Sequence, residues 1–387
     1  IPLRHRPRDV QSRPRRRSRL PRPRERGPQL GTHLETVSSE YRLQAARISK
    51  QEHPIKTNWQ PLHGNFFKST RILITGGAGF IGSHLAEALC ALGAQVVVLD
   101  DLSGGTTDNL AGFPLEFIHG SILDKTLLAR ATAGCRFVFH QAALGSVPRS
   151  VEQPVLYNEV NTTGTLNVLE AARSAKVARV MFAASSSAYG DNPVPWVEHM
   201  PVRPQSPYAA TKVAGEALLG AYAHSLGLDT VSLRYFNIFG PRQNANSAYA
   251  AVIAAFAKAY LASPPTPPII YGDGTQTRDF TFVHNAVHAN LLAARHPAPL
   301  RGEILNVGTG GQISVNALAA LMAELFGAPL GTPLPHHAPE RAGDLKHSFA
   351  DLTKIRETLG YAPMADFRGA LQATCDWYAS VLGTQIS

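Results

Sequence analysis

The strongest signal in the chain is the run Ile72-Leu73-Ile74-Thr75-Gly76-Gly77-Ala78-Gly79-Phe80-Ile81-Gly82. A short apolar segment ends in Gly-x-x-Gly-x-x-Gly and continues into an amphipathic segment, 83–92, which predicts a strand, a glycine turn and a helix. Gly76 would form the tight turn, Gly79 would let a pyrophosphate approach the backbone, and Gly82 would allow close packing of helix on strand. The N–H groups at the start of that helix would face the phosphates.

An acidic residue after the next apolar segment bears on which dinucleotide is bound. The segment 95–99 ends in Asp100, 18 residues after Gly82. A carboxylate there can accept hydrogen bonds from the adenosine ribose hydroxyls, and no Arg follows closely to receive a 2′-phosphate. The pattern therefore predicts NAD rather than NADP.

The net charge of +9 is unevenly distributed over the 387 residues. Residues 1–68 carry 16 Lys and Arg against 5 Asp and Glu, whereas the other residues carry 21 against 23. Segment 1–28 is mostly Arg and Pro, and its scarcity of apolar residues predicts a disordered tail. An RNA- or DNA-binding arm and a transit peptide are open interpretations of it. The first Met is Met181, inside the expected fold, which is consistent with part of the tail being upstream reading frame.

Cysteine usage and hydropathy indicate the compartment. Cys90, Cys135 and Cys375 are far apart and lack the spacing of metal ligands, which indicates a reducing compartment and no structural zinc. The sequence has no apolar run of 18 residues and no recognisable secretory signal, so we expect a cytoplasmic protein without a membrane span.

Apolar strands alternate with helical stretches between residues 71 and 234, which predicts an α/β fold, a Rossmann-like doubly wound parallel sheet. Prolines and glycine turns become frequent beyond residue 234, which indicates a smaller C-terminal α/β substrate domain. The expected domains are a disordered tail with an irregular lead-in (1–68), an NAD-binding domain (69–234) with returns near 280–310, and a nucleotide-sugar domain (235–387). Expected strands are 71–75, 95–99, 115–118, 136–140, 179–184, 229–234 and 304–307, and expected helices are 80–92, 124–132, 154–175, 207–226 and 284–295.

Three hydroxyl or amine groups follow at positions suited to proton transfer. Ser185 closes an expected strand, and Tyr208 and Lys212 lie at i and i+4 on an expected helix, so both face the same way. The ammonium can stabilise a phenolate and lower the pKa of Tyr208 toward that of a general base, and the Ser185 hydroxyl can share the substrate proton.

At this point residues 71–380 are seen to resemble the extended short-chain dehydrogenase/reductase family, in its nucleotide-sugar branch. The matching stretches also include His140-Gln141-Ala142-Ala143, Leu233-Arg234-Tyr235-Phe236-Asn237, Gly272-Asp273-Gly274 through Arg278-Asp279-Phe280, and Asn306-Val307-Gly308. The resemblance implies that Ser185, Tyr208 and Lys212 are catalytic. It implies that NAD contacts Gly76, Gly79, Phe80, Ile81, Gly82, Asp100, Ser103, Gly104, Ser121, Ile122, Gln141, Ala142, Ala143, Tyr208, Lys212 and Tyr235.

The resemblance also implies a reaction class. Dehydratases of the family carry Thr-Asp-Glu where this chain has Ser185-Ser186-Ser187, so the acid that dehydration requires is missing. An epimerase needs none, because it moves one proton and one hydride. The implied mechanism is that Tyr208 removes the proton of the sugar 4-hydroxyl with help from Ser185, hydride passes to NAD, and the 4-keto sugar turns over before the hydride returns.

Three longer runs are similar to those of UDP-N-acetylglucosamine 4-epimerases. They are Gln141-Ala142-Ala143-Leu144-Gly145-Ser146-Val147-Pro148-Arg149-Ser150, Arg242-Gln243-Asn244-Ala245-Asn246-Ser247-Ala248-Tyr249 and Gly343-Asp344-Leu345-Lys346-His347-Ser348. Family members restricted to glucose carry a Tyr at the position of Ser348, so the match implies room for an N-acetyl group. It implies that the UDP-sugar contacts Gly145, Ser146, Ser185, Ser186, Ser187, Asn237, Gln243, Ala251, Val252, Tyr271, Arg278, Arg341, Asp344 and Ser348.

Two features depart from the simplest interpretation. The family usually has Asp where this chain has Ser121, and that shorter residue would bind the adenine amino group less well. His284 and His288 lie at i, i+4, but the sequence supplies no third ligand, so we expect no metal site and place them on a helix surface.

Other functions stay open at this stage. UDP-glucuronate and UDP-glucose are alternative substrates, and a non-catalytic NAD-binding redox sensor is an alternative class. Apolar residues on 154–175 and 207–226, together with the resemblance, predict a homodimer. We do not expect the protein to bind a membrane, and we do not expect its folded part to bind nucleic acid. The apolar residues in question are Val160, Leu166, Val213, Leu218 and Leu219.

Overall fold

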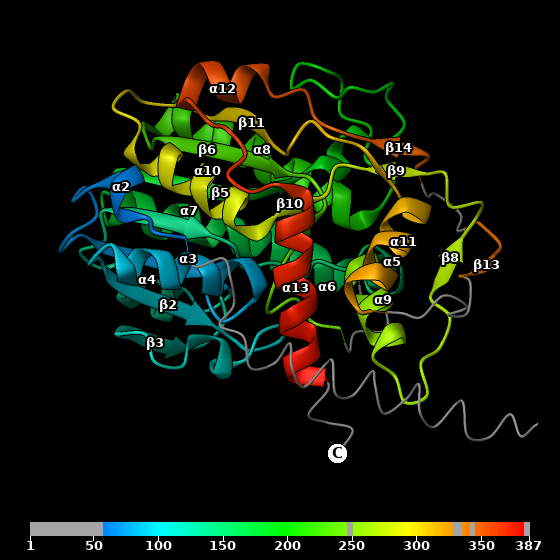
Figure 1. Cartoon of the computed structure of the whole chain (residues 1–387). Coiled ribbons are helices and arrows are strands. Elements are labelled where there is room, and N and C mark those ends of the chain that lie inside the picture. Colours follow the sequence, from blue (N-terminus) through cyan, green and yellow to red (C-terminus); the bar gives the residue numbers. More distant parts are fainter. Residues whose placement is uncertain (1–56, 246–250, 328–334, 341–344, 383–387) are drawn as a thin grey trace, which may run out of the picture.

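The expected alternation of strands and helices forms one parallel sheet in the computed structural model, which describes residues 57–245, 251–327, 335–340 and 345–382. Within these residues, the order in the seven-stranded sheet is β11-β6-β5-β4-β1-β2-β3 (Figure 1). The order reverses between β1 and β4, which creates the crevice where doubly wound sheets bind ligands. The strands are β1 (Arg71–Thr75), β2 (Gln95–Asp100), β3 (Leu115–His119), β4 (Phe137–His140), β5 (Arg179–Ser185), β6 (Thr230–Tyr235) and β11 (Glu303–Val307).

Helices cover both faces of this sheet because successive residues of each strand point to opposite sides. In β1, Ile72 and Ile74 pack on one face and Leu73 on the other. The face of Ile72 is covered by α3 (Phe80–Ala91) and α10 (Val283–Arg295). The other face is covered by α4 (Lys125–Thr132), α7 (Gly164–Ser174) and α8 (Pro207–Leu226).

The C-terminal part of the chain builds a second apolar core beside the sheet. Phe256 of α9 (Val252–Tyr260), Leu318 of α11 (Val315–Leu325) and Tyr378 of α13 (Phe367–Leu382) belong to it (Figure 1). In contrast, residues of α10 and β11 belong to the first core. The remaining strands are β7 (Ile238–Phe239), β8 (Ile269–Tyr271), β9 (Thr277–Arg278), β10 (Thr281–Phe282), β12 (Ile313–Ser314), β13 (His336–Ala338) and β14 (His347–Ser348), and the remaining helices are η1 (Thr107–Leu110), α5 (Val147–Glu152), η3 (Ser186–Tyr189) and α12 (Thr353–Leu359).

The long helix expected over 154–175 is interrupted. A π-helical turn, η2 (Glu159–Thr163), separates α6 (Pro154–Asn158) from α7. The turn places Asn161 so that its side chain bonds the backbone N–H and C=O of Leu144 and the hydroxyl of Thr211. A π-turn widens the helix locally and often marks a functional site.

The lead-in to the first strand is more ordered than expected. Residues 57–68 include the short helix α2 (Gln60–His63), and Trp59 and Phe67 are buried against the first core. The surface placement of His284 and His288 is also wrong, because both pack against this lead-in. Thr57 Oγ1 lies 2.7 Å from His284 Nδ1, and His288 Nδ1 lies 3.4 Å from His63 Nε2. Among the described residues no group of three or more His, Cys, Asp or Glu is arranged to hold a metal ion.

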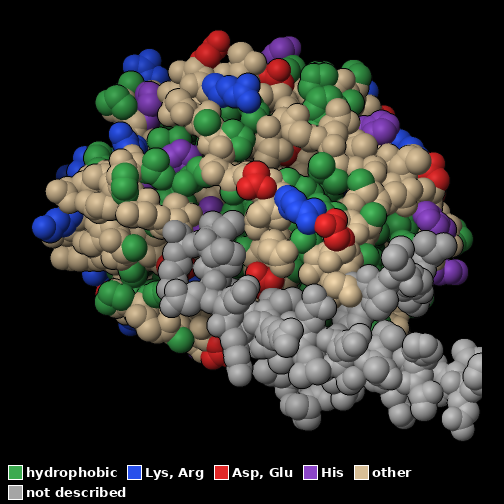
Figure 2. All heavy atoms as spheres, viewed as in Figure 1, with side chains coloured by type: hydrophobic (Ala, Val, Ile, Leu, Met, Phe, Trp, Pro, Cys, Tyr) green, Lys and Arg blue, Asp and Glu red, His purple; other side chains and the backbone are tan. Residues whose placement is uncertain are grey.

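The surface agrees with the near-neutral charge of the folded part. In Figure 2, basic and acidic side chains of the described residues are interspersed among polar and apolar ones. A membrane-crossing helix, long and apolar, does not occur in the described part of the chain.

Candidate functional site

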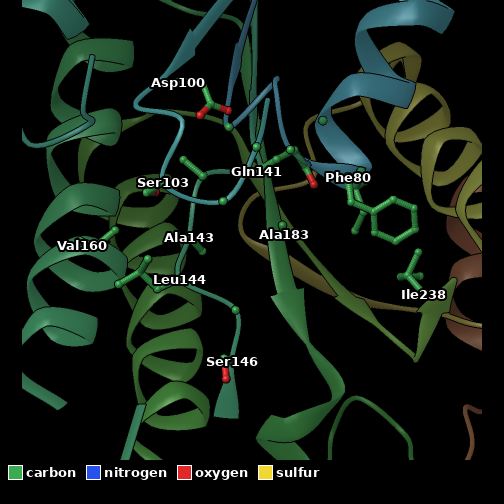
Figure 3. Close-up of a pocket in the computed structure, with 18 of the residues that line it drawn as sticks. Phe80, Asp100, Ser103, Gln141, Ala143, Leu144, Ser146, Val160, Ala183 and Ile238 are labelled. Carbon is green, nitrogen blue, oxygen red and sulfur yellow. The ribbon is translucent and has the colours of Figure 1, made fainter. Parts of the chain in front are cut away.

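A cavity of about 600 Å³ lies where the strand order reverses. Its walls come from the glycine turn after β1, the end of β2, the loop 141–146 after β4, the end of β5 and the start of α8. Figure 3 shows Asp100 at one end of this cavity and Ser146 at the other, with Val160 and Leu144 beside each other on one wall and Phe80 near Ile238 on the opposite wall.

In the glycine turn, backbone packs so closely on backbone that side chains would clash. Gly76 has a φ of +70°, and a Cβ there would lie 2.6 Å from the backbone nitrogen of Ala142. A Cβ on Gly82 would lie 2.1 Å from the carbonyl oxygen of Gly76. Among the described residues, no side chain caps the N-terminus of α3, so its first N–H groups and its dipole face the cavity. The turn therefore has the form of a pyrophosphate site.

Asp100 lies at the end of β2, as expected for a ribose ligand. Its Oδ2 accepts from the N–H of Ala78 at 2.9 Å, and its Oδ1 accepts from the N–H of Leu102 at 2.8 Å. Burial raises the pKa of this carboxyl, and the backbone N–H donors act in the opposite direction. Each oxygen keeps a second lone pair for a hydroxyl.

A hydrogen-bonded set fixes the loop after β4. Tyr235 Oη donates to Gln141 Oε1 at 3.2 Å and accepts from Asn290 Nδ2 at 2.6 Å. Burial raises the pKa of Tyr235 to about 12, so the phenol stays neutral. Tyr235 and Gln141 both line the cavity, and the fixed phenol shapes its wall.

Ser185, Tyr208 and Lys212 come together at the other end of the cavity. Lys212 Nζ lies 5.9 Å from the centre of the Tyr208 ring and donates to the carbonyl of Ala183 at 2.8 Å. Burial lowers the pKa of Lys212 to about 8, against an opposing effect of Glu216. Burial raises the pKa of Tyr208, and the Ser185 hydroxyl counteracts that increase by hydrogen bonding. Desolvation therefore sets the direction, and the pKa of Tyr208 is not lowered as the Tyr-x-x-x-Lys spacing predicted.

A second cavity, about 240 Å³, adjoins the first through Asn237, Ile238, Gln243 and Ala251. Val252, Tyr271 and Arg278 line this second cavity further along. The Arg278 guanidinium donates to the backbone carbonyl of Thr277 at 2.9 Å. Together the two cavities form a continuous cleft between the sheet and the second core.

Most of the predicted contact residues line this cleft, and a few do not. Ser121 is outside the lining, where its Oγ accepts from Leu123 N–H at 3.3 Å. Ser186, Ser187 and Ser348 are also outside it. Ser348 is buried behind the wall, with its Oγ 3.5 Å from Oδ1 of Asn237, which does line the cleft. Arg341 and Asp344 lie outside the described residues. The predicted residues that do line the cleft are Gly76, Gly79, Phe80, Ile81, Gly82, Asp100, Ser103, Gly104, Ile122, Gln141, Ala142, Ala143, Gly145, Ser146, Ser185, Tyr208, Lys212, Tyr235, Asn237, Gln243, Ala251, Val252, Tyr271 and Arg278.

Sequence reasoning missed several lining residues. Val160 lines the cavity from the π-turn η2, which periodicity does not reveal. Leu144 lies within a run already singled out, and Asp101 adjoins Asp100, so their positions offered a signal. The other missed residues include Gly105, Gly120, Ala183, Ala184, Ile238, Asn244, Gln276 and Phe280.

Comparisons with known proteins agree with this geometry. Residues 72–308 match the NAD dependent epimerase/dehydratase family. The chain is 41% identical to a UDP-glucose 4-epimerase of Mycolicibacterium smegmatis over 315 residues, 80% of this chain and 98% of the relative. It resembles the solved UDP-N-acetylglucosamine 4-epimerase of Methanobrevibacter ruminantium in complex with UDP-N-acetylmuramic acid (38% identity, TM-score 0.76, 81% and 99% of the two chains). It also resembles the Thermus thermophilus UDP-glucose 4-epimerase complex with NAD (37% identity, TM-score 0.72, 81% and 100%).

Proposed function

The chain belongs to the NAD dependent epimerase/dehydratase family, and we propose that this NAD-dependent UDP-sugar 4-epimerase interconverts UDP-N-acetylglucosamine and UDP-N-acetylgalactosamine. The observation that carries the choice of sugar is the small, buried side chain of Ser348 next to Asn237. A bulky residue there would displace Asn237, which lines both cavities, and would narrow the cleft where an N-acetyl group would lie.

The acid–base groups of the cleft favour epimerisation over dehydration. The acidic residues among the described lining of both cavities are Asp100 and Asp101, at the end of β2. Ser185, Tyr208 and Lys212 belong to β5 and α8 and have no carboxylate beside them in that lining. A dehydratase must also protonate a leaving hydroxyl, and this arrangement offers no second acid for that step.

We assign the proton transfer to Tyr208. Its phenolate would accept the proton of the sugar 4-hydroxyl, with Ser185 donating a hydrogen bond to the same oxygen. Lys212 would hold positive charge next to the phenolate. NAD, when bound along the glycine turn and Asp100, supplies the group that takes the hydride from the sugar carbon and gives it back. The 4-keto sugar then accepts the hydride on its other face.

The UDP part would lie in the second cavity. Arg278 offers a planar fork of donors suited to diphosphate oxygens, and Val252 and Tyr271 offer apolar surface to the uracil ring. Asn237 stands between the two cavities and next to Ser348, where the sugar would join the diphosphate. Arg341 and Asp344 are proposed as further UDP ligands on the resemblance alone.

The assignment is tested by NMR of the purified protein with UDP-N-acetylglucosamine, UDP-glucose and UDP-glucuronate in turn. We expect the N-acetylated substrate to equilibrate with its 4-epimer fastest. Faster turnover of UDP-glucose or UDP-glucuronate would make that sugar the substrate, and no turnover of any would favour a redox sensor. The proximity of Ser185, Tyr208 and Lys212 argues against the sensor.

We further propose a cytoplasmic homodimer, in line with the three free cysteines and the exposed apolar residues of α6 and α7.

A further inference from the structure

Ser185, at the end of β5, and Ser187, in the short helix η3 that follows, have different hydrogen-bonding roles. Ser185 is the last residue of the strand and is buried, and the chain then turns into the short helix η3. That turn brings Ser187 back over Ser185. The Ser187 N–H donates to Ser185 Oγ at 3.2 Å, and the Ser187 hydroxyl donates to the same oxygen at 2.9 Å.

The two bonds limit what Ser185 can do. A serine hydroxyl has one proton to donate and two lone pairs to accept with. Both lone pairs of Ser185 Oγ are taken by Ser187, so only its proton is left for a third partner. That partner is Tyr208, whose phenol is close enough for a hydrogen bond with Ser185 to counter the effect of burial on its pKa.

We propose that Ser187 is a positioning residue that holds Ser185 as a hydrogen-bond donor toward Tyr208 and the sugar 4-oxygen, and thereby favours the phenolate. A neutral phenol at Tyr208 cannot donate its own proton to Ser185, whose lone pairs are both taken, although it can accept a weaker hydrogen bond from Ser185. A phenolate accepts the Ser185 proton directly, and a hydrogen bond to the charged form favours that form. When the 4-hydroxyl gives its proton to Tyr208, the Ser185 proton is available to the oxygen of the 4-keto sugar.

This inference departs from the substrate contact that the family resemblance implies for Ser187, because its hydroxyl is bound to Ser185 and it is outside the described lining of the cleft. It rests on the proposed role of Tyr208 as the base. It does not depend on which UDP-sugar is the substrate.

The test is a spectroscopic titration of Tyr208 in the full-length protein saturated with NAD and without substrate. Tyrosinate absorbance is followed with pH, and the same titration of Tyr208→Phe is subtracted. Because one hydroxyl donor is lost, Ser187→Ala should raise the midpoint assigned to Tyr208 by about half to one pH unit. Ser187→Thr keeps a hydroxyl and should restore the wild-type midpoint.

A matched control is Ser232→Ala, since Ser232 is buried on the neighbouring strand β6 and its hydroxyl has no partner among the described residues. That variant should leave the midpoint unchanged. The pH profile of kcat should shift upward with the midpoint in Ser187→Ala, with KM little altered. A midpoint that stays or falls, or a rise in KM with an unshifted profile, would overturn the proposal. If Tyr208→Phe leaves every tyrosinate transition of the titration in place, the role of Tyr208 as base fails too. That outcome is distinct from an unshifted midpoint in Ser187→Ala, which would count against Ser187 alone.

Discussion

Lys212 on α8 donates a 2.8 Å hydrogen bond from its ammonium to the backbone carbonyl of Ala183 on β5. The bond joins the helix that carries Tyr208 to the strand that ends in Ser185. One helical turn beyond Lys212, Glu216 forms a buried two-pronged ion pair with Arg234 of β6, with both distances 2.7 Å. The start of α8 is thus fixed against two neighbouring strands, and the proton-handling groups keep their relative positions without substrate.

Tyr208→Phe should retain the fold and bound NAD but lose epimerisation. The change removes only the group that accepts the proton, and such assistance is worth about 10²–10⁴-fold in rate. The measurement is kcat on the preferred UDP-sugar together with the NAD content of the purified variant. Turnover near the wild-type value would rule out Tyr208 as the base.

Ser348→Tyr should abolish activity on UDP-N-acetylglucosamine and spare or increase activity on UDP-glucose. Ser348, in β14, is buried beside Asn237. An aromatic ring at position 348 would therefore push against Asn237 and take up the room that the acetamido group would occupy. Ser348→Ala keeps the residue small and should preserve both activities. The check is kcat/KM for both sugars in all three proteins. A parallel loss of both activities in Ser348→Tyr would make Ser348 a structural residue.

Removal of the basic tail should leave the enzyme intact, whereas removal of the lead-in should not. A chain that begins at Gln51 keeps Trp59 and Phe67 in the first core and should match the full chain in activity and unfolding midpoint. A chain that begins at Ser69 loses both and should be strongly destabilised.

Phe67→Ala should lower the free energy of unfolding, measured in urea, by about 3–5 kcal/mol. The half-exposed neighbour provides the control: Phe66→Ala should cost less, and equal losses would contradict this packing.

Stability should fall as the pH drops from about 6.5 toward 4. Burial lowers the pKa of His63, His284 and His288 from 6.5 to about 4 in the folded protein, with Arg295 and Arg242 adding to it. The unfolded chain binds more protons in that interval, so protonation favours unfolding there, and the stability is fully present above 6.5. His288→Gln should flatten the fall of Tm with pH, whereas Gln at the exposed His199 should not. The same slope of Tm against pH in both variants would be evidence that the buried His63, His284 and His288 do not cause the fall.

The homodimer expected from apolar helix residues needs a corrected basis. Leu219 is fully buried in the core of its own chain, and Leu218 and Val160 are partly buried against that core, so much of their apolar surface is used within the chain. Leu166 on α7 is 37% exposed and Val155 on α6 is 80% exposed. Light scattering at micromolar concentration should give a dimer mass, and Leu166→Asp should shift it toward the monomer. A monomeric wild-type protein would contradict the expectation.

The sequence by itself determined the parallel sheet and the glycine turn after its first strand. Alternating apolar strands and helices, with glycines at the first turn and Asp100 after the second strand, carry local information about backbone geometry. The positions of α3 and α8 and the proximity of Tyr208 and Lys212 follow from these patterns. Each depends on residues near one another in the chain, which is why periodicity was sufficient.

Only the tertiary structure decided the features that depend on residues far apart. Burial of His284 and His288 depends on residues 57–68, more than 200 positions away, which cover them. The pKa of Tyr208 is raised by burial that the Tyr-x-x-x-Lys spacing does not convey. The opposed roles of Ser185 and Ser187 depend on the turn after β5, because three identical side chains differ only in where the backbone aims them. Packing and desolvation are properties of the folded assembly, and adjacent residues alone do not specify them.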